Sequence, residues 1–467
     1  MSLAAGVYLG ALALLALAGA RAGVGPGYRA LVSLALAAAP LLAVDRPWLV
    51  LTGVAIAASC AARGRRVAGE DHEARLFAVA LVAHMLLWTG GRIAAYALPL
   101  ALLAAASVVR AAAERLAPDR AVFRWWDDRR TVVGARAVGL STAAVTLALL
   151  PWLTAIAPLE RLGIALAVGV ICCLCEGASR QGSGVLSLLV GAAIGVELLV
   201  TRAEAGALAP ALAWIAFAVG LALITRRLRL LTAGGAAGAA IVGVFLFTAE
   251  GRAGAIPLLA FFLLSSALSK LADRRRGAPQ ARGKGSTRDL AQVFANGGVA
   301  MALGLADVLL ELPFAYPALV ASLAAAAADT WATEIGGFSK RPPRRLLGGA
   351  PVAPGTSGGV TTLGLVGALA GALAVTACAA PFLEGGPRVL VIVALSGLLA
   401  SVFDSLLGDT LQARFRDPAT GAIVEESPSA SAPAIAGLRW MDNDAVNLLA
   451  TLFGAVVCLI ACLLSQG

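Results

Sequence analysis

Acidic side chains suited to metal binding stand at the end of a very apolar run in the second half of the chain. The segment reads Asp329-Thr330-Trp-Ala-Thr333-Glu334. In a helix, Asp329 and Thr333 share a face and Glu334 points about 140° away from Asp329, so we expect the two acids to line adjacent walls of a pocket. Carboxylates, waters and substrate phosphates are the ligands that Mg²⁺ prefers. A purely structural role for both acids is the alternative.

A second acid lies inside an apolar run. Asp404 belongs to a stripe of polar or small residues at helical spacing, formed by Ser401, Asp404, Ser405, Gly408 and Gln412, and Asp409 adjoins this stripe. A charged residue in the middle of a membrane helix costs roughly 2.5–3.5 kcal/mol on insertion scales, which favours a functional role. A structural hydrogen bond from Asp404 to a partner helix is the alternative.

Between these acids, a basic loop precedes a glycine-rich turn. The basic residues include Arg344 and Arg345, and the turn contains Gly355, Thr356, Ser357, Gly358 and Gly359. Successive backbone N–H groups in a glycine turn, followed at once by a helix start, form an anion site. Guanidinium groups add phosphate affinity. The turn lacks the Walker pattern G-x-x-x-x-G-K-[ST], so this is not a P-loop.

Two further polar patches open apolar runs. They consist of Gln292 and Asn296 in the first patch, and of Asn443, Asp444 and Asn447 in the second. Gln292 and Asn296 are four residues apart and therefore share a helix face. Both patches also suit helix capping, so a structural role remains open for each. Together the five patches predict a site for Mg²⁺ and a phosphorylated ligand, and the neighbouring lipid favours a long-chain phosphate.

The amino-acid composition indicates which kind of secondary structure holds these residues. Of 467 residues, 60% are hydrophobic and 14% are charged, which is typical of an integral membrane protein and far from a soluble domain. The apolar runs are too long, and alternate too little, for an outer-membrane barrel. Two histidines exclude a multi-histidine metal site. We therefore expect an all-α, polytopic helical bundle of about 16 transmembrane helices.

The expected spans divide evenly between the two halves of the chain. They run over 3–20, 29–44, 47–62, 76–90, 94–113, 136–156, 160–176, 184–201, 207–224, 233–249, 254–270, 291–310, 314–329, 358–379, 388–409 and 444–464. Residues 1–205 are expected to form an N-terminal membrane domain of unclear role. Residues 206–467, where polar residues enter or adjoin the spans, are expected to form the catalytic domain.

The positive charges support this alternation. When the connections after odd-numbered spans are placed on one side, that side carries 31 of the 37 Lys and Arg residues. The positive-inside rule makes that side cytoplasmic and both termini extracytoplasmic. The net charge of +10 is then explained by topology and anionic lipid rather than by nucleic acid. This topology favours a bacterial inner membrane with the site facing the cytoplasm.

In their order and spacing the patches resemble the transmembrane protein 19 and phytyl-phosphate kinase family, over about residues 210–467. The matching segments are Asp289-Leu-Ala-Gln-Val-Phe-Ala-Asn-Gly-Gly, Ala328-Asp-Thr-Trp-Ala-Thr-Glu-Ile-Gly, Pro354-Gly-Thr-Ser-Gly-Gly-Val, Phe403-Asp-Ser-Leu-Leu-Gly-Asp-Thr-Leu-Gln and Asp444-Ala-Val-Asn. The resemblance implies an integral membrane kinase that uses a nucleoside triphosphate, CTP, to convert an isoprenyl monophosphate to the diphosphate.

The resemblance also implies roles for individual residues. Asp329, Glu334 and Asp404 would be catalytic, with Asp329 and Asp404 holding Mg²⁺ and Asp409 assisting. The nucleotide would lie against Arg344, Arg345 and the glycine turn 355–359. Residues around the substrate would be Gln292, Asn296, Thr330, Thr333, Ser405, Asp409, Gln412, Asn443, Asp444 and Asn447.

Two other functions fit the same sequence. A cytidylyltransferase that forms a CDP-lipid would use the same substrates and metal, and a transporter of lipid-linked or small solutes would explain the many spans. A transporter is expected to show inverted repeats with broken helices in both halves, whereas the polar residues here gather in one half. In the first half, the segment from Glu176 to Val185 faintly resembles the last motif of phytol and dolichol kinases, without its metal-binding carboxylate.

Overall fold

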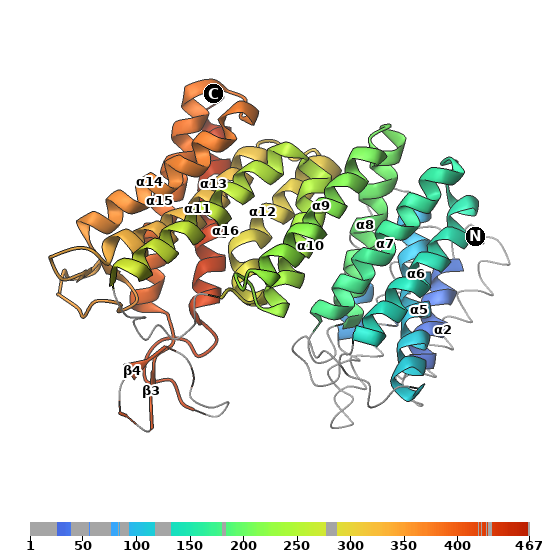
Figure 1. Ribbon diagram of the computed structural model, residues 1–467, viewed down its shortest axis with the longest axis horizontal. Coiled ribbons are helices and arrows are strands. Elements are labelled where there is room, and N and C mark those ends of the chain that lie inside the picture. Colours follow the sequence, from blue (N-terminus) through green and yellow to red (C-terminus); the bar gives the residue numbers. More distant parts are fainter. Residues whose placement is uncertain are drawn as a thin grey trace. The chain divides into compact units, whose positions relative to one another are not determined.

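The computed structural model is built almost entirely from helices (Figure 1). It describes residues 26–38, 56, 76–82, 84, 93–116, 132–179, 184–276, 287–418, 420–421, 423–425, 427 and 432–465. The contacts divide the chain into two units, residues 1–215 and 216–467. The expected span 3–20 lies outside the described residues, as does nearly all of 47–62.

The first unit contains five described helices and the beginning of a sixth. They are α2 (Pro26–Ala38), α5 (Ile93–Leu116), α6 (Val132–Leu153), α7 (Pro158–Ala178), α8 (Gly184–Glu204) and the first part of α9 (Leu208–Arg227). α6 and α7 approach closely because Gly139 and Gly169 face each other, and a Cβ on Gly169 would lie 2.7 Å from the Gly139 carbonyl oxygen. Glu176 on α7 forms a 3.5 Å ion pair with Arg110 on α5.

The second unit contains the rest of α9 and seven further helices. These are α10 (Ala233–Glu250), α11 (Arg252–Arg276), α12 (Leu290–Leu310), α13 (Ala315–Gly336), α14 (Thr362–Ala379), α15 (Gly386–Thr410) and α16 (Asn443–Leu464). A short 3₁₀ helix, η2 (Ala380–Phe382), follows α14. Two small antiparallel sheets pair β1 (Arg344–Arg345) with β2 (Gly359–Val360), and β3 (Phe415–Arg416) with β4 (Ile423–Val424).

α13 is the central helix of the second unit and packs against α11, α12, α14, α15 and α16 (Figure 1). Its alanine run, residues 324–328, is buried. Glycines on the neighbouring helices meet this smooth surface: Gly371 on α14 lies against the Ala327 carbonyl, and Gly397 on α15 lies against Ala324. Small residues let membrane helices approach closely, and the core here is built on that contact.

Side-chain caps begin every even-numbered helix of this unit. Thr232, Asp289, Thr361 and Asp442 each accept a hydrogen bond from a backbone N–H in the first turn of α10, α12, α14 and α16 respectively. These helix starts lie at the same end of the unit as the last turns of α11, α13 and α15, since Ser269 contacts Glu334 and Met441 contacts Ala413. All five polar patches are therefore brought to one end.

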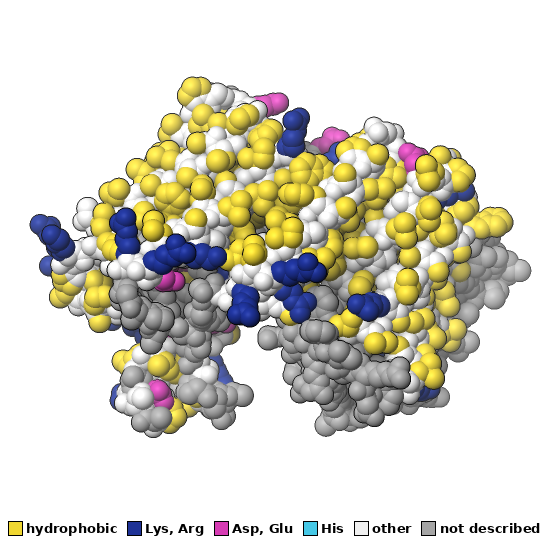
Figure 2. Space-filling view, viewed as in Figure 1, with side chains coloured by type: hydrophobic (Ala, Val, Ile, Leu, Met, Phe, Trp, Pro, Cys, Tyr) yellow, Lys and Arg dark blue, Asp and Glu magenta, His cyan; other side chains and the backbone are white. Residues whose placement is uncertain are grey.

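The protein is an all-α polytopic membrane protein. Eleven of the described helices are long and apolar enough to cross a membrane: α5–α12 and α14–α16. The central α13 is not one of them because its last turns are polar, and the total of sixteen stays a prediction. Figure 2 shows the visible face largely covered by hydrophobic side chains, with Lys and Arg grouped toward helix ends. The expected span 358–379 begins later, at Thr362, because Gly359 and Val360 pair with β1.

Candidate functional site

Asp329 on α13 and Asp404 on α15 form a pair of carboxylates that repel one another electrostatically. Both side chains are only partly exposed. The Oδ2 atom of Asp404 is buried and accepts no hydrogen bond in the described part of the chain. A buried carboxylate oxygen without a donor is costly, and a second negative charge nearby adds to that cost. The pair is therefore an arrangement that a cation would stabilise.

Each carboxylate of the pair could contribute an oxygen ligand to a metal ion. Among the described residues, no group of three or more His, Cys, Asp or Glu side chains is placed to hold one. A metal ion at this pair would need further ligands, such as water or a substrate phosphate, as Mg²⁺ commonly has.

The other polar residues of α13 are directed elsewhere. Glu334 is buried and accepts a 2.9 Å hydrogen bond from the Ser269 hydroxyl on α11. Thr330 donates to the Ala326 carbonyl one turn earlier, at 3.0 Å, and Thr333 is exposed. On α15, Ser405 likewise donates to the Ser401 carbonyl, at 3.2 Å. The Thr330 and Ser405 hydroxyls are thus hydrogen-bonded within their own helices, and the hydrogen bond between Glu334 and Ser269 joins α13 to α11.

The basic loop and the glycine turn lie side by side. Pairing of β1 with β2 places Arg344 opposite Val360 and Arg345 opposite Gly359. Arg344 is exposed and its guanidinium donates to the Gly349 carbonyl at 2.8 Å. Thr356 closes the turn, since its carbonyl accepts a 3.1 Å hydrogen bond from the Gly359 N–H. The basic loop and the glycine turn, which are neighbours in sequence, are therefore also neighbours in the structure.

The glycine turn packs directly on the last turn of α15. Gly358 has φ = 80°, and a Cβ there would lie 2.5 Å from the Asp409 nitrogen, so only glycine fits. Gly355 also has a positive φ, of 88°, but faces open space. The Asp409 carboxylate pairs with Arg345 at 2.8 Å and with Arg414 at 3.9 Å. Asp409 on α15 therefore binds the basic loop through Arg345, while the glycine turn contacts its backbone through Gly358.

Glu425 is a contact residue that the sequence patterns did not indicate. Its Oε1 accepts a hydrogen bond from the Ser357 backbone N–H at 3.3 Å, and its Oε2 accepts one from Gln412 Nε2 at 3.0 Å. The Glu425 carboxylate thus accepts the hydrogen bond of a backbone N–H in the turn, and this turn was expected to bind phosphate. This position is compatible with an anion site and places a competing charge in it.

The start of α16 adjoins the same region. The Asp442 carboxylate accepts from the Ala445 N–H at 2.9 Å, so the capping role expected for this patch belongs to Asp442. Asn443 is exposed, Asp444 is buried and Asn447 is partly buried. The Met441 carbonyl accepts a 2.8 Å hydrogen bond from the Ala413 N–H, which ties α16 to the chain leaving α15.

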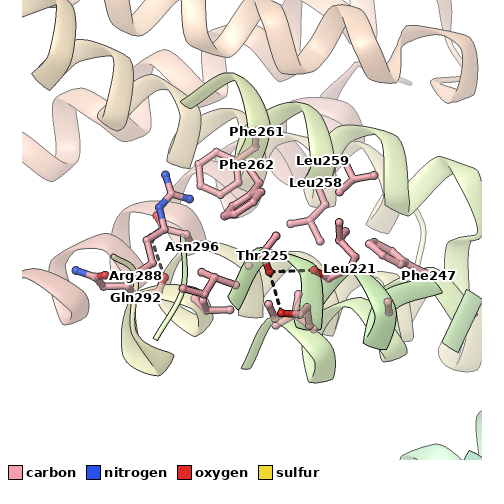
Figure 3. Close-up of a pocket in the computed structure, with 17 residues that line it drawn as sticks. Leu221, Thr225, Phe247, Leu258, Leu259, Phe261, Phe262, Arg288, Gln292 and Asn296 are labelled. Carbon is pink, nitrogen blue, oxygen red and sulfur yellow. Dashed lines mark hydrogen bonds between the residues drawn. The ribbon is translucent and has the colours of Figure 1, made fainter. Parts of the chain in front are cut away.

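Gln292 and Asn296 lie in a different place from the carboxylate pair. Gln292 forms a reciprocal capping box with Asp289, and Asn296 donates to the Gln292 carbonyl at 2.8 Å. Both side chains line a pocket between α9, α10, α11 and α12 (Figure 3). Neither Asp329 nor Asp404 lines this pocket. The structure therefore separates the predicted substrate residues of α12 from the predicted metal ligands.

The family described as "Integral membrane protein DUF92" matches residues 216–455, which are nearly the whole second unit. The chain belongs to the DUF92 family. The DUF92 match contains the carboxylate pair, the glycine turn and the pocket. DUF92 is the transmembrane protein 19-like family, which the sequence motifs of this chain resemble.

Relatives of this DUF92 chain occur in plants, archaea and cyanobacteria. Protein PGR of Arabidopsis thaliana is 32% identical over 254 residues, covering 49% of this chain and 87% of that protein. An uncharacterized membrane protein of Methanocaldococcus jannaschii is 26% identical over 51% of this chain and 88% of its own length. One from Synechocystis sp. is 27% identical over 52% of this chain and 86% of its own. No solved structure matches the chain.

Proposed function

We propose that the second unit is a membrane phosphotransferase that moves the γ-phosphoryl group of a nucleoside triphosphate, CTP, to an isoprenyl monophosphate. The observation that carries this proposal is the placement of the glycine turn and Arg345 on the last turn of α15. The same helix bears Asp404, which interacts with Asp329. The groups proposed to bind phosphate and the acidic groups thus lie at one end of one helix.

The reaction needs positioning and charge neutralisation more than covalent chemistry. A phosphate oxygen of the isoprenyl monophosphate attacks the γ-phosphorus and forms a new P–O bond. The bond from that phosphorus to the β–γ bridging oxygen breaks, and CDP leaves with the electron pair. Backbone N–H groups of the turn and the Arg344 and Arg345 guanidiniums would bind and orient the triphosphate.

Asp329 and Asp404 are the residues that would hold Mg²⁺. Their fit rests on the buried, unbonded Oδ2 of Asp404 and on the mutual repulsion of the two carboxylates. When bound, the ion would neutralise charge that develops on the transferred phosphoryl group. We place the site on the cytoplasmic side of a bacterial inner membrane, where nucleotide is present, as the distribution of Lys and Arg favours.

Product analysis tests the proposal. Purified full-length protein in detergent receives Mg²⁺, CTP and geranylgeranyl monophosphate, and products are identified by mass spectrometry. We expect CDP and a diphosphate lipid, lost in Asp329→Asn and Asp404→Asn. The matched control is Asp307→Asn, which changes a carboxylate of α12 outside the site and is expected to retain activity. Pyrophosphate with a CMP–lipid adduct would instead identify a cytidylyltransferase, and absence of turnover would refute both reactions.

A further inference from the structure

The pocket between α9, α10, α11 and α12 joins an apolar interior to a positively charged end (Figure 3). Its volume is about 70 Å³. The apolar walls include Phe247, Leu258 and Leu259, and Figure 3 shows Phe247 at the end opposite Arg288. A water needs only about 10–15 Å³, so the pocket has room for several carbon atoms of a chain.

The depth of the pocket suits an extended chain. On α10 its lining runs from Ala239 to Phe247, a rise of eight residues, or about 12 Å at 1.5 Å per residue. These residues lie in helices that are long and apolar enough to cross a membrane. The narrow volume favours one chain over the two chains of an ordinary phospholipid. The direction of the pocket therefore suits an apolar tail that lies along the helices and ends near Phe247.

Arg288 is the charged group at the pocket end. Its guanidinium carbon lies 5.1 Å from the ring centre of Phe261 and 5.4 Å from that of Phe262. The two rings hold the cation over the pocket wall. Its backbone is fixed as well: its N–H donates to the Leu230 carbonyl at 3.2 Å and its carbonyl accepts from the Thr232 N–H at 3.0 Å. The guanidinium is thus held in place before any ligand binds.

No carboxylate forms an ion pair with Arg288 anywhere in the described residues. Burial lowers the pKa of the Arg288 guanidinium to about 10, so the side chain remains charged near neutral pH. A partly buried cation without a counter-charge is unfavourable unless an anion compensates it. Gln292 and Asn296 line the same pocket, and the Gln292 side-chain nitrogen and the second N–H of the Asn296 amide are left to donate to such an anion.

We propose that this pocket binds a single-chain amphiphile with a phosphate head, the chain lying among Leu258, Leu259 and Phe247 and the phosphate against Arg288. An isoprenyl monophosphate has this chemistry, and its choice as the probe rests on the proposed function. Binding itself needs neither nucleotide nor transfer. The pocket therefore remains testable if the protein has no kinase activity.

Binding without nucleotide tests the proposal. Full-length protein in detergent is titrated with geranylgeranyl monophosphate, geranylgeraniol or dioleoyl phosphatidic acid, and bound lipid is counted by native mass spectrometry. We expect the monophosphate to bind about tenfold or more tightly than the alcohol, as a charge-assisted contact implies. Equal affinity for the alcohol would refute the role of Arg288. Tighter binding of phosphatidic acid would identify a bilayer lipid and refute the single-chain assignment.

Variants locate the binding. Arg288→Gln is expected to weaken binding of the monophosphate about tenfold, and Arg288→Lys to weaken it less, because the charge is kept. The matched control is Arg227→Gln, which removes an exposed charge from the end of α9 without touching the pocket. Equal losses in Arg288→Gln and Arg227→Gln would show general surface attraction and overturn the proposal.

A second variant fills the apolar part of the pocket. Ala239→Phe places a ring where the chain is expected to lie, and we expect it to abolish binding of the monophosphate while nucleotide binding is retained. Retained lipid binding in Ala239→Phe would place the site elsewhere. Lipid binding without product formation would refute the kinase and leave the pocket assignment intact. Product formation that Arg288→Gln leaves unchanged would show that the pocket does not hold the acceptor and would leave the kinase proposal intact.

Discussion

The Arg345 guanidinium donates to the Asp409 carboxylate over 2.8 Å and so joins the basic loop to the end of α15, across 64 residues of sequence. Gly358 lies against the backbone of the same Asp409. The turn is therefore held on α15 both by an ion pair and by a close backbone contact. This relationship gives the candidate anion site a fixed position relative to Asp404 on the same helix.

Gly358→Ala is expected to destabilise the protein by roughly 2–4 kcal/mol, because it adds a Cβ at φ = 80° and 2.6 Å from the Asp409 Cβ. Gly355→Ala is the matched control: it has the same type of backbone strain, at φ = 88°, but faces open space, and is expected to cost about 1 kcal/mol. Thermal unfolding in detergent measures both. Equal costs would mean that the contact with α15 contributes nothing.

Glu425→Gln is expected to raise the affinity for CTP about three- to tenfold, because it removes a negative charge from the amide of Ser357. Asp417→Asn, in the same loop but hydrogen-bonded to Thr420, is the control and is expected to leave the affinity unchanged. Equilibrium binding of a fluorescent CTP analogue provides the measurement. Weaker binding in Glu425→Gln would instead make Glu425 a structural support of the turn.

Asp404→Asn is expected to abolish transfer and to raise the Tm. The variant removes a charge from a buried carboxylate oxygen that accepts no hydrogen bond, and with it the repulsion from Asp329. Thermal unfolding without Mg²⁺ gives the Tm, and product analysis gives the activity. A lower Tm would show that the carboxylate serves the fold through a hydrogen bond to a neighbouring helix.

Gly371→Ala is expected to destabilise the second unit by several kcal/mol, about 2–4, since the new Cβ would lie 2.7 Å from the Ala327 carbonyl oxygen on α13. Gly220→Ala on α9 has no atom within 4 Å of the added Cβ and is expected to be neutral or slightly stabilising, because alanine favours a helix. Unfolding of each variant in detergent is compared. A neutral Gly371→Ala would contradict close packing of α14 on α13.

Much of the fold of the second unit could be predicted from the sequence. The apolar runs predict the existence and order of α9–α16, because a membrane helix must satisfy its own backbone hydrogen bonds. The ends of α11 and α13 lie six and seven residues beyond the predicted spans, since their last turns are polar. Two capping acids, Asp289 and Asp442, were likewise open to prediction, since their side chains act on the nearest turn. The sixteen-span count extends beyond the described residues and stays a prediction.

The partners of the polar side chains could not be predicted in the same way. Helical period fixes the relative direction of Asp329 and Glu334, but not which helix each faces: α11 supplies Ser269 to Glu334, whereas α15 supplies Asp404 near Asp329. Glycines and alanines between the helices set those rotations. Glu425 lies in the loop between α15 and α16, so no helical periodicity could predict its contact with Ser357.

The sequence by itself therefore determined the class of protein, the helices of the second unit and the end at which its polar residues gather, because these follow from hydropathy, period and local caps. Only the tertiary structure decided that Asp409 pairs with Arg345, that Glu425 occupies the turn, and that Arg288 and Gln292 belong to a separate pocket. Such pairs depend on the close packing of small residues between helices and on loops that return to them, which no single segment encodes.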